Sequence, residues 1–125
     1  MPLEVFVVDD SAPVRERLLG MLTALAGVCV VGQAADAAQA IRGILDCRPQ
    51  VVLLDLQLGD GSSGFDVLRG VCPQAPGIEF FMLSNFATPA YRRTAADLGA
   101  RGFFDKTQEF SQLMDLLAAR ARPPA

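Results

Sequence analysis

The sequence predicts an α/β fold in which five parallel strands form one open sheet and helices cover both of its faces. Two observations support this doubly wound (βα)5 arrangement. Five short apolar runs recur along the chain, and segments with apolar residues at helical spacing lie between them. The runs are continuous rather than alternating, which is typical of strands buried on both faces of a parallel sheet. Right-handed crossovers then place helices on both sides of the sheet.

The strands are expected at the apolar runs. Most of these runs are rich in β-branched or aromatic residues, which fit a pleated, buried surface. The predicted strands are residues 5–8, 28–31, 51–54, 78–83 and 102–104.

The helices are expected between the strands, and several of their ends are marked. Pro13 and Pro89 stand where the first turn of a helix would begin, and Asp36 is a candidate N-cap. Pro73 and Gly99 mark two helix ends. The predicted apolar stripes are Val14, Leu18, Leu22 and Leu25; Ala37, Ala40, Ile41, Ile44 and Leu45; Phe65, Leu68 and Val71; Tyr91, Ala95 and Leu98; and Phe110, Leu113, Met114 and Leu117.

Length and charge limit the possible functions. A chain of 125 residues is the size of one domain. We assign residues 1–121 to that domain and residues 122–125 to a tail or the stump of a linker. The net charge of -3 provides no basic surface, so we expect no direct nucleic-acid binding by this chain alone. The sequence shows neither a signal peptide nor an apolar run of about 20 residues, which predicts a cytoplasmic protein without membrane contact.

The three cysteines do not suggest a metal site or disulfides. Cys29, Cys47 and Cys72 are far apart, and the chain has no histidine to complete a zinc site. We expect them to be small, buried or half-buried apolar residues in a reducing compartment.

Residues with reactive side chains follow four of the five predicted strands. Because ligands bind beyond the carboxyl ends of the strands in an open α/β sheet, these residues should meet at one edge. Each position alone is ordinary for a solvated loop, but four strand ends carry complementary groups. They are Asp9 and Asp10 after the first strand, Asp55 after the third, Ser84 after the fourth, and Asp105 with Lys106 after the fifth.

This set of groups suits phosphoryl chemistry. Clustered carboxylates repel one another, and Mg²⁺, which prefers oxygen ligands, relieves that repulsion. A carboxylate is also a nucleophile toward phosphorus and yields an acyl phosphate. The metal ion, Lys106 and the hydroxyl of Ser84 would pair with the negative phosphoryl oxygens. Lys106 is the only lysine beside ten arginines, and a compact ammonium suits a small anion site.

The motifs that carry these residues resemble the receiver (response regulator) family across essentially the whole chain. The resemblance implies a flavodoxin-like fold and a role in two-component phosphorelay signalling, in which an aspartate accepts a phosphoryl group. The matching motifs are Val7-Val8-Asp9-Asp10-Ser11, Val52-Leu53-Leu54-Asp55, Met82-Leu83-Ser84, and Gly99 through Lys106.

The resemblance assigns a role to each site residue. It implies that Asp55 is the phosphoacceptor. It also implies that Asp9, Asp10, Asp55 and the backbone carbonyl of Gln57 hold Mg²⁺. Lys106 and Ser84 are expected to contact the phosphoryl oxygens.

The resemblance also implies a switch and a signalling surface. Ser84 and Phe103, an aromatic residue of the fifth strand, are expected to rearrange together on phosphorylation. The fourth helix, fifth strand and fifth helix would form the signalling face and a possible homodimer interface, although an ordinary solvated helix face remains an open alternative. That face carries Tyr91, Arg92, Arg93 and Arg101.

Several residues depart from the family pattern. Thr107 follows Lys106 where the family often has a cis proline, and we expect a trans bond there because a cis bond before a non-proline residue costs about 3 kcal/mol. The loop 56–64 lacks the usual proline and holds three glycines and two serines, which predicts greater mobility. Asn85 and the bulky Phe86 follow Ser84 and are expected to narrow access to the phosphoryl group.

The predicted function is therefore a phosphorylation-controlled switch that receives its phosphoryl group from a histidine kinase or a histidine phosphotransfer protein. No enzymatic activity is expected beyond self-catalysed phosphoryl acceptance and hydrolysis. The output would be a partner protein or a missing C-terminal domain. The stretch Val30 to Ala34 is similar to that of receivers that carry a DNA-binding domain.

Two other functions are compatible with parts of the sequence. A degenerate receiver that acts only as a binding module, without phosphorylation, is the first. An aspartate-nucleophile phosphatase is the second and fits poorly, because adjacent Asp9 and Asp10 at a strand end point in different directions.

Overall fold

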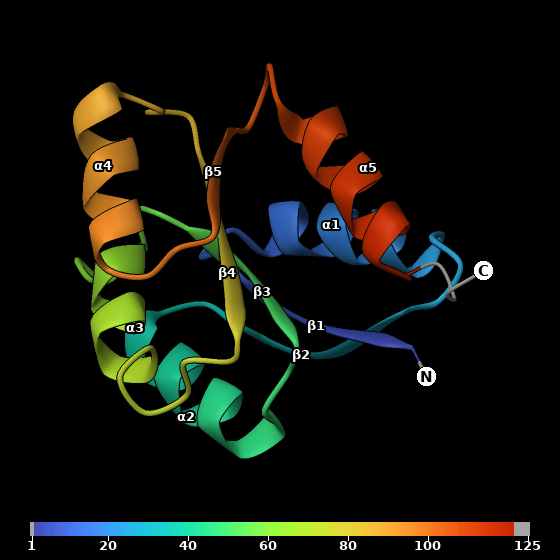
Figure 1. Ribbon diagram of the computed structural model, residues 1–125, viewed down its shortest axis with the longest axis horizontal. Coiled ribbons are helices and arrows are strands. Elements are labelled where there is room, and N and C mark those ends of the chain that lie inside the picture. Colours follow the sequence, from blue (N-terminus) through green and yellow to red (C-terminus); the bar gives the residue numbers. More distant parts are fainter. Residues whose placement is uncertain (1, 122–125) are drawn as a thin grey trace.

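The computed structural model describes residues 2–121 and contains five strands and five helices that alternate along the chain (Figure 1). The predicted tail at 122–125 lies outside these residues. The strands are β1 (Leu3–Val8), β2 (Val28–Ala34), β3 (Val51–Asp55), β4 (Glu79–Ser84) and β5 (Gly102–Asp105), and the helices are α1 (Ala12–Thr23), α2 (Ala37–Cys47), α3 (Gly64–Val71), α4 (Pro89–Asp97) and α5 (Phe110–Ala121).

All strand pairs are parallel, and the order across the sheet is β2-β1-β3-β4-β5. The order reverses between β1 and β3, and in an open α/β sheet this is where a ligand-binding crevice forms at the carboxyl ends. In Figure 1, α1 and α5 lie on one side of the sheet and α2, α3 and α4 on the other. The predicted doubly wound fold is confirmed.

Alternate residues of each strand feed two separate apolar clusters. Val5 and Val7 pack with Leu22 and Leu117 under α1 and α5. Neighbours of these strand residues, such as Phe6, face the cluster under α2, α3 and α4. The period-two alternation of side chains across a strand therefore fills both layers from each continuous apolar run.

The prediction of burial on both faces is right for the three central strands and wrong for the two edge strands, β2 and β5, of which β5 buries only Phe103. Every residue of β3 is buried, whereas six of the seven residues of β2 are partly or fully exposed. The reason is the strand order: β2 and β5 lie at the two edges of the sheet, where β2 pairs only with β1 and β5 pairs only with β4. Among the residues described, no helix is both long and apolar enough to cross a lipid bilayer.

Side chains at the helix starts follow the predicted capping pattern. The side chain of Asp36 accepts a hydrogen bond from the backbone N–H of Gln39 at 2.8 Å, which confirms it as the N-cap of α2. Thr88 caps α4 in the same way through the N–H of Tyr91 at 3.1 Å. Two predicted stripes extend past their helices: α1 ends at Thr23, so Leu25 lies in the turn that follows, and α4 ends at Asp97, so Leu98 lies just beyond it.

The cysteine prediction is wrong for two of the three residues. Cys29 and Cys47 are exposed, and only Cys72 is half-buried. Cys29 lies on the edge strand β2, and Cys47 is the last residue of α2, so neither is covered by a second layer.

Candidate phosphoryl-acceptor site

The carboxyl ends of β1, β3, β4 and β5 surround a cavity of about 400 Å³. The register of the sheet explains why the predicted residues meet there. Val8 pairs with Leu54, so Asp9 and Asp55 leave their strands at the same level, and Ser84 pairs with Asp105. The strands β3 and β4 each end one residue later than predicted, so Asp55 and Ser84 are their last residues rather than loop residues.

Asp55 is a buried carboxylate paired with the ammonium of Lys106. The residue is 9% exposed, and its Oδ2 accepts a hydrogen bond from Nζ of Lys106 at 3.1 Å. Burial raises the pKa of Asp55 from 3.8 to about 6, the negative charges of Asp9 and Asp10 add to this, and Lys106 acts in the opposite direction. At neutral pH the group is therefore still mostly ionised, and its burial beside two other carboxylates outweighs the attraction of Lys106.

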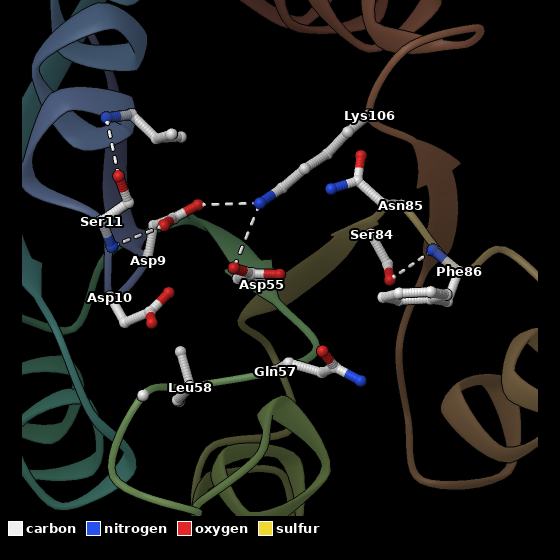
Figure 2. Close-up of a pocket in the computed structure, with 12 residues that line it drawn as sticks. Asp9, Asp10, Ser11, Asp55, Gln57, Leu58, Ser84, Asn85, Phe86 and Lys106 are labelled. Carbon is white, nitrogen blue, oxygen red and sulfur yellow. Dashed lines mark hydrogen bonds and ion pairs between the residues drawn. The ribbon is translucent and has the colours of Figure 1, made fainter.

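Asp9 and Asp10 are adjacent in sequence but differ in environment. Asp9 is 2% exposed, accepts from the backbone N–H of Ser11 at 2.9 Å, and accepts from Lys106 Nζ at 3.1 Å. Asp10 is exposed and points into the cavity (Figure 2). One carboxylate oxygen from each of Asp9, Asp10 and Asp55 lies within 4.8 Å of the others.

These three carboxylates fit a bound Mg²⁺. They converge on one side of a polar cavity, as Figure 2 shows, and they supply the hard oxygen ligands that Mg²⁺ prefers. Burial and two acidic neighbours raise the pKa of Asp55. A divalent cation at this place would offset the repulsion between the three carboxylates. Gln57 also lines the cavity, but the role of its backbone carbonyl as a ligand stays a prediction.

Lys106 reaches between Asp9 and Asp55 from the loop that joins β5 to α5 (Figure 2). Burial alone would lower its pKa, but the attraction of Asp55 and Asp9 outweighs burial, so the pKa of Lys106 lies above its usual value. The turn beyond it is held by the carboxylate of Asp105, which accepts from the N–H and the hydroxyl of Thr107, each at 2.8 Å. No peptide bond within residues 2–121 is cis, so the expected trans bond before Thr107 is confirmed.

Ser84 lies on the far side of the cavity from Asp9. It is 1% exposed, and its Oγ accepts from the backbone N–H of Phe86 at 2.9 Å. Asn85 and Phe86 both line the cavity, and Phe86 is 52% exposed at its rim. Their position agrees with the expected narrowing, while the effect on access stays a prediction.

The loop after Asp55 contains more hydrogen bonds than its composition suggested. The N–H of Leu58 donates to the carbonyl of Ser62 at 3.1 Å, and the carboxylate of Asp60 accepts from the N–H of Ser62 at 3.0 Å. The hydroxyl of Ser62 accepts from the N–H of Ala37 at 3.2 Å, which joins the loop to α2. Its mobility remains a prediction.

Comparison with known proteins identifies this arrangement. The profile of the response regulator receiver domain matches residues 5–118.

The chain belongs to the response regulator receiver domain family.

Relatives of this receiver domain include proteins with different outputs. It is 38% identical over 116 residues to a protein-glutamate methylesterase/protein-glutamine glutaminase of Koribacter versatilis, covering 90% of this chain and 31% of that protein. It is 32% identical to the DNA-binding transcriptional activator DevR/DosR of Mycobacterium tuberculosis, covering 83% of this chain and 48% of the activator. The chain thus spans about a third to a half of these relatives.

Solved structures confirm the flavodoxin-like receiver fold. The response regulator domain of Thermotoga maritima CheB superimposes with a TM-score of 0.85 at 26% identity, covering 98% of this chain and 95% of that one. A LuxR-family response regulator from Aurantimonas gives a TM-score of 0.89 at 26% identity, covering 97% of this chain and 86% of that one.

The structure also places the expected switch residue of this receiver domain and gives it a neighbour, Arg92, that the sequence assigned only to the signalling face. Phe103 is 9% exposed and packs in the cluster that includes Ala95. Its rearrangement with Ser84 is untested. The Arg92 side chain is 38% exposed, and its guanidinium lies over the Phe103 ring rather than pointing only to solvent. The signal in the sequence was its spacing of three residues from Ala95, which puts both on one helix face.

Proposed function

We propose that Asp55 accepts a phosphoryl group from a phosphohistidine of a histidine kinase or a histidine phosphotransfer protein, and that this modification switches the chain between two signalling states. The observation that supports the proposal best is the buried carboxylate of Asp55 at a strand end, 3.1 Å from the ammonium of Lys106 and beside two further carboxylates.

The proposed step is a displacement at phosphorus. An oxygen of ionised Asp55 forms a bond to phosphorus while the bond from phosphorus to the donor imidazole nitrogen breaks, and the bonding electrons stay on that nitrogen. The product is an acyl phosphate, and attack by water on phosphorus later restores the carboxylate and releases inorganic phosphate. Because the pKa of Asp55 is raised only to about 6, the nucleophilic form predominates at neutral pH.

The groups around Asp55 stabilise the charge on the transferred phosphoryl oxygens. Asp9, Asp10, Asp55 and the backbone carbonyl of Gln57 would hold Mg²⁺, which neutralises negative charge on those oxygens. Lys106 would exchange its bond to Asp55 for one to a phosphoryl oxygen, and the hydroxyl of Ser84 would donate a second.

Further consequences of this function concern output and location. The relatives named above combine a receiver domain with DNA-binding or methylesterase functions, so we infer that this chain signals through a further domain or a partner rather than through its own catalysis of another substrate. A homodimer through α4, β5 and α5 is one such partner. The chain itself, with a net charge of -3, does not contact nucleic acid directly, and we place it in the cytoplasm, away from membranes.

Intact-mass measurement after incubation with acetyl phosphate and Mg²⁺ tests the proposal. Wild type should gain one phosphoryl group, Asp55→Asn should gain none, and Asp10→Asn should lose labelling through weaker Mg²⁺ binding. Asp115→Asn, at an exposed position on α5, is the control and should label like wild type. Full labelling of Asp55→Asn would refute the central assignment, and an unlabelled wild type would favour the binding module without phosphorylation.

A further inference from the structure

Arg92 joins three segments that lie around the phosphoryl site. From α4, its Nε donates to the carbonyl of Ala87 at 3.2 Å, in the loop that follows Ser84. One terminal nitrogen donates to the carbonyl of Phe103 in β5 at 2.8 Å, and the other donates to Oε1 of Glu109 at 2.6 Å. The fork of one guanidinium thus bonds in three directions at once.

Glu109 extends this contact to the segment that carries Lys106. The same Oε1 accepts from the backbone N–H of Asp105 at 2.9 Å, one residue before Lys106. The N–H of Lys106 in turn donates to the carbonyl of Ser84 at 3.0 Å. A closed circuit of hydrogen bonds therefore runs from Arg92 through Glu109 to the backbone at Lys106, and returns through the loop after Ser84.

The ring of Phe103 lies beneath the same side chain. The guanidinium carbon is 5.5 Å from the ring centroid, within the range of a cation–π contact. The Arg92 hydrogen bond also holds the pKa of Glu109 below its usual range, so the pair is charged at neutral pH. Arg92 therefore covers the aromatic residue while it anchors the backbone on either side of the site.

We propose that Arg92 is a positioning residue for the phosphoryl site. It holds the loop after Ser84 and the segment that carries Lys106 at a fixed separation. At that separation the Ser84 hydroxyl and the Lys106 ammonium can both contact one anion bound at Asp55. This inference rests on the proposed function, because that anion is the phosphoryl group. Lysine cannot replace Arg92, since one ammonium cannot reproduce a planar fork that bonds Ala87, Phe103 and Glu109 together.

Its neighbour on α4 provides a matched control. Arg93 has the same charge and the same helix, but it is exposed, and within residues 2–121 the structure gives it no ion pair or side-chain hydrogen bond. A role that depends only on positive charge near the site, or on α4 as a recognition surface, would affect both arginines. A role that depends on the three bonds affects Arg92 alone.

The first measurement needs no phosphate chemistry. Arg92→Met keeps the aliphatic stem over Phe103 and removes the donors, so the fold should survive. Mass-resolved labelling with an amine reagent then follows Lys106, the one lysine, against the α-amino group. We expect Lys106 to label several-fold faster in Arg92→Met than in wild type, because its loop is less firmly held. Arg93→Met should label like wild type.

The second measurement is the affinity for beryllofluoride with Mg²⁺, determined by calorimetry. Arg92→Met and Arg92→Lys should each weaken binding about tenfold, the effect of losing roughly one charge-assisted hydrogen bond. Glu109→Ala should weaken beryllofluoride binding too. The double variant Arg92→Met with Glu109→Ala should bind about as weakly as either single variant, because both residues belong to one shared circuit of hydrogen bonds.

The outcomes separate this inference from the proposed function. If wild type does not bind beryllofluoride, the proposed function fails, and the labelling comparison alone decides whether Arg92 positions Lys106. Unchanged labelling of Lys106 in Arg92→Met overturns the inference. So does wild-type binding by Arg92→Lys, or full additivity of Arg92→Met with Glu109→Ala.

Discussion

Replacing Asp55 with asparagine should stabilise the folded chain when no divalent cation is present, although the substitution removes the central reactive group. Burial raises the pKa of Asp55 from 3.8 to about 6. At about 1.4 kcal/mol per pKa unit, the ionised carboxylate therefore costs the folded protein about 3 kcal/mol relative to the unfolded chain. Asparagine avoids that cost but gives Lys106 a weaker acceptor, so we expect a net gain of about 1 to 3 kcal/mol at pH 7.5.

The sign of the pH dependence follows from the direction of the shift. A carboxyl group whose pKa is raised on folding contributes stability that is fully present below its unfolded value of 3.8 and is lost as the pH rises through about 6. Wild type should therefore lose stability relative to Asp55→Asn across that interval. The difference should be small at pH 4 and should reach its full size above about pH 7.

Urea unfolding followed by circular dichroism at a series of pH values measures this difference. Asp115→Asn, on the exposed face of α5, controls for the general effect of removing one negative charge. Added Mg²⁺ should narrow the difference, because the ion stabilises the charged form that only wild type offers. The reasoning is refuted if Asp55→Asn is no more stable than wild type at pH 7.5, or if the difference does not change with pH.

Three further predictions follow from the site and its surroundings. Mg²⁺ should raise the melting temperature of wild type and raise it less in Asp10→Asn, since one ligand is lost; equal shifts would mean that the ion binds elsewhere. Lys106 should react slowly with amine reagents, and more slowly still with magnesium beryllofluoride present, because its ammonium is held by carboxylates; mass-resolved labelling at the rate of a free amine would contradict its placement. Gly64→Ala should lower the free energy of unfolding by about 1 to 3 kcal/mol, since a Cβ there would lie 2.5 Å from the carbonyl oxygen of Asp55. Gly20→Ala should instead raise the free energy of unfolding by about 0.5 to 1 kcal/mol, because no atom lies within 4 Å of the added Cβ in that helix. Urea unfolding compares the two variants.

The sequence was sufficient to predict which residues share the site. Continuous apolar runs mark the central strands, and in a parallel sheet the residues after such runs must meet at one edge. Asp9, Asp55 and Lys106 therefore lie together as predicted, joined by two bonds of 3.1 Å. The type of each element followed from the continuous apolar runs and from the helical spacing between them, and only the ends moved by a few residues.

Properties that depend on strand order or on contacts between distant segments could not be predicted. The exposure of Cys29 follows from the edge position of β2, and nothing local to residues 28–34 distinguishes an edge strand from a central one. The contacts of Arg92 depend on where Phe103 and Glu109 lie once α4 has packed on β5. The difference between buried Asp9 and exposed Asp10 likewise appears only when the crevice has formed.

The two exposed thiols affect how any self-association of this chain should be interpreted. Cys29 lies on β2, at the sheet edge opposite β5, and Cys47 ends α2, which packs beside that strand. Air oxidation during purification would link chains back to back through this edge, far from the surface formed by α4 and β5. Such a covalent pair would persist without any phosphoryl donor and disappear on a gel run with dithiothreitol. Sizing experiments on this molecule therefore need a reductant, or serine at both positions, before a dimer is attributed to signalling.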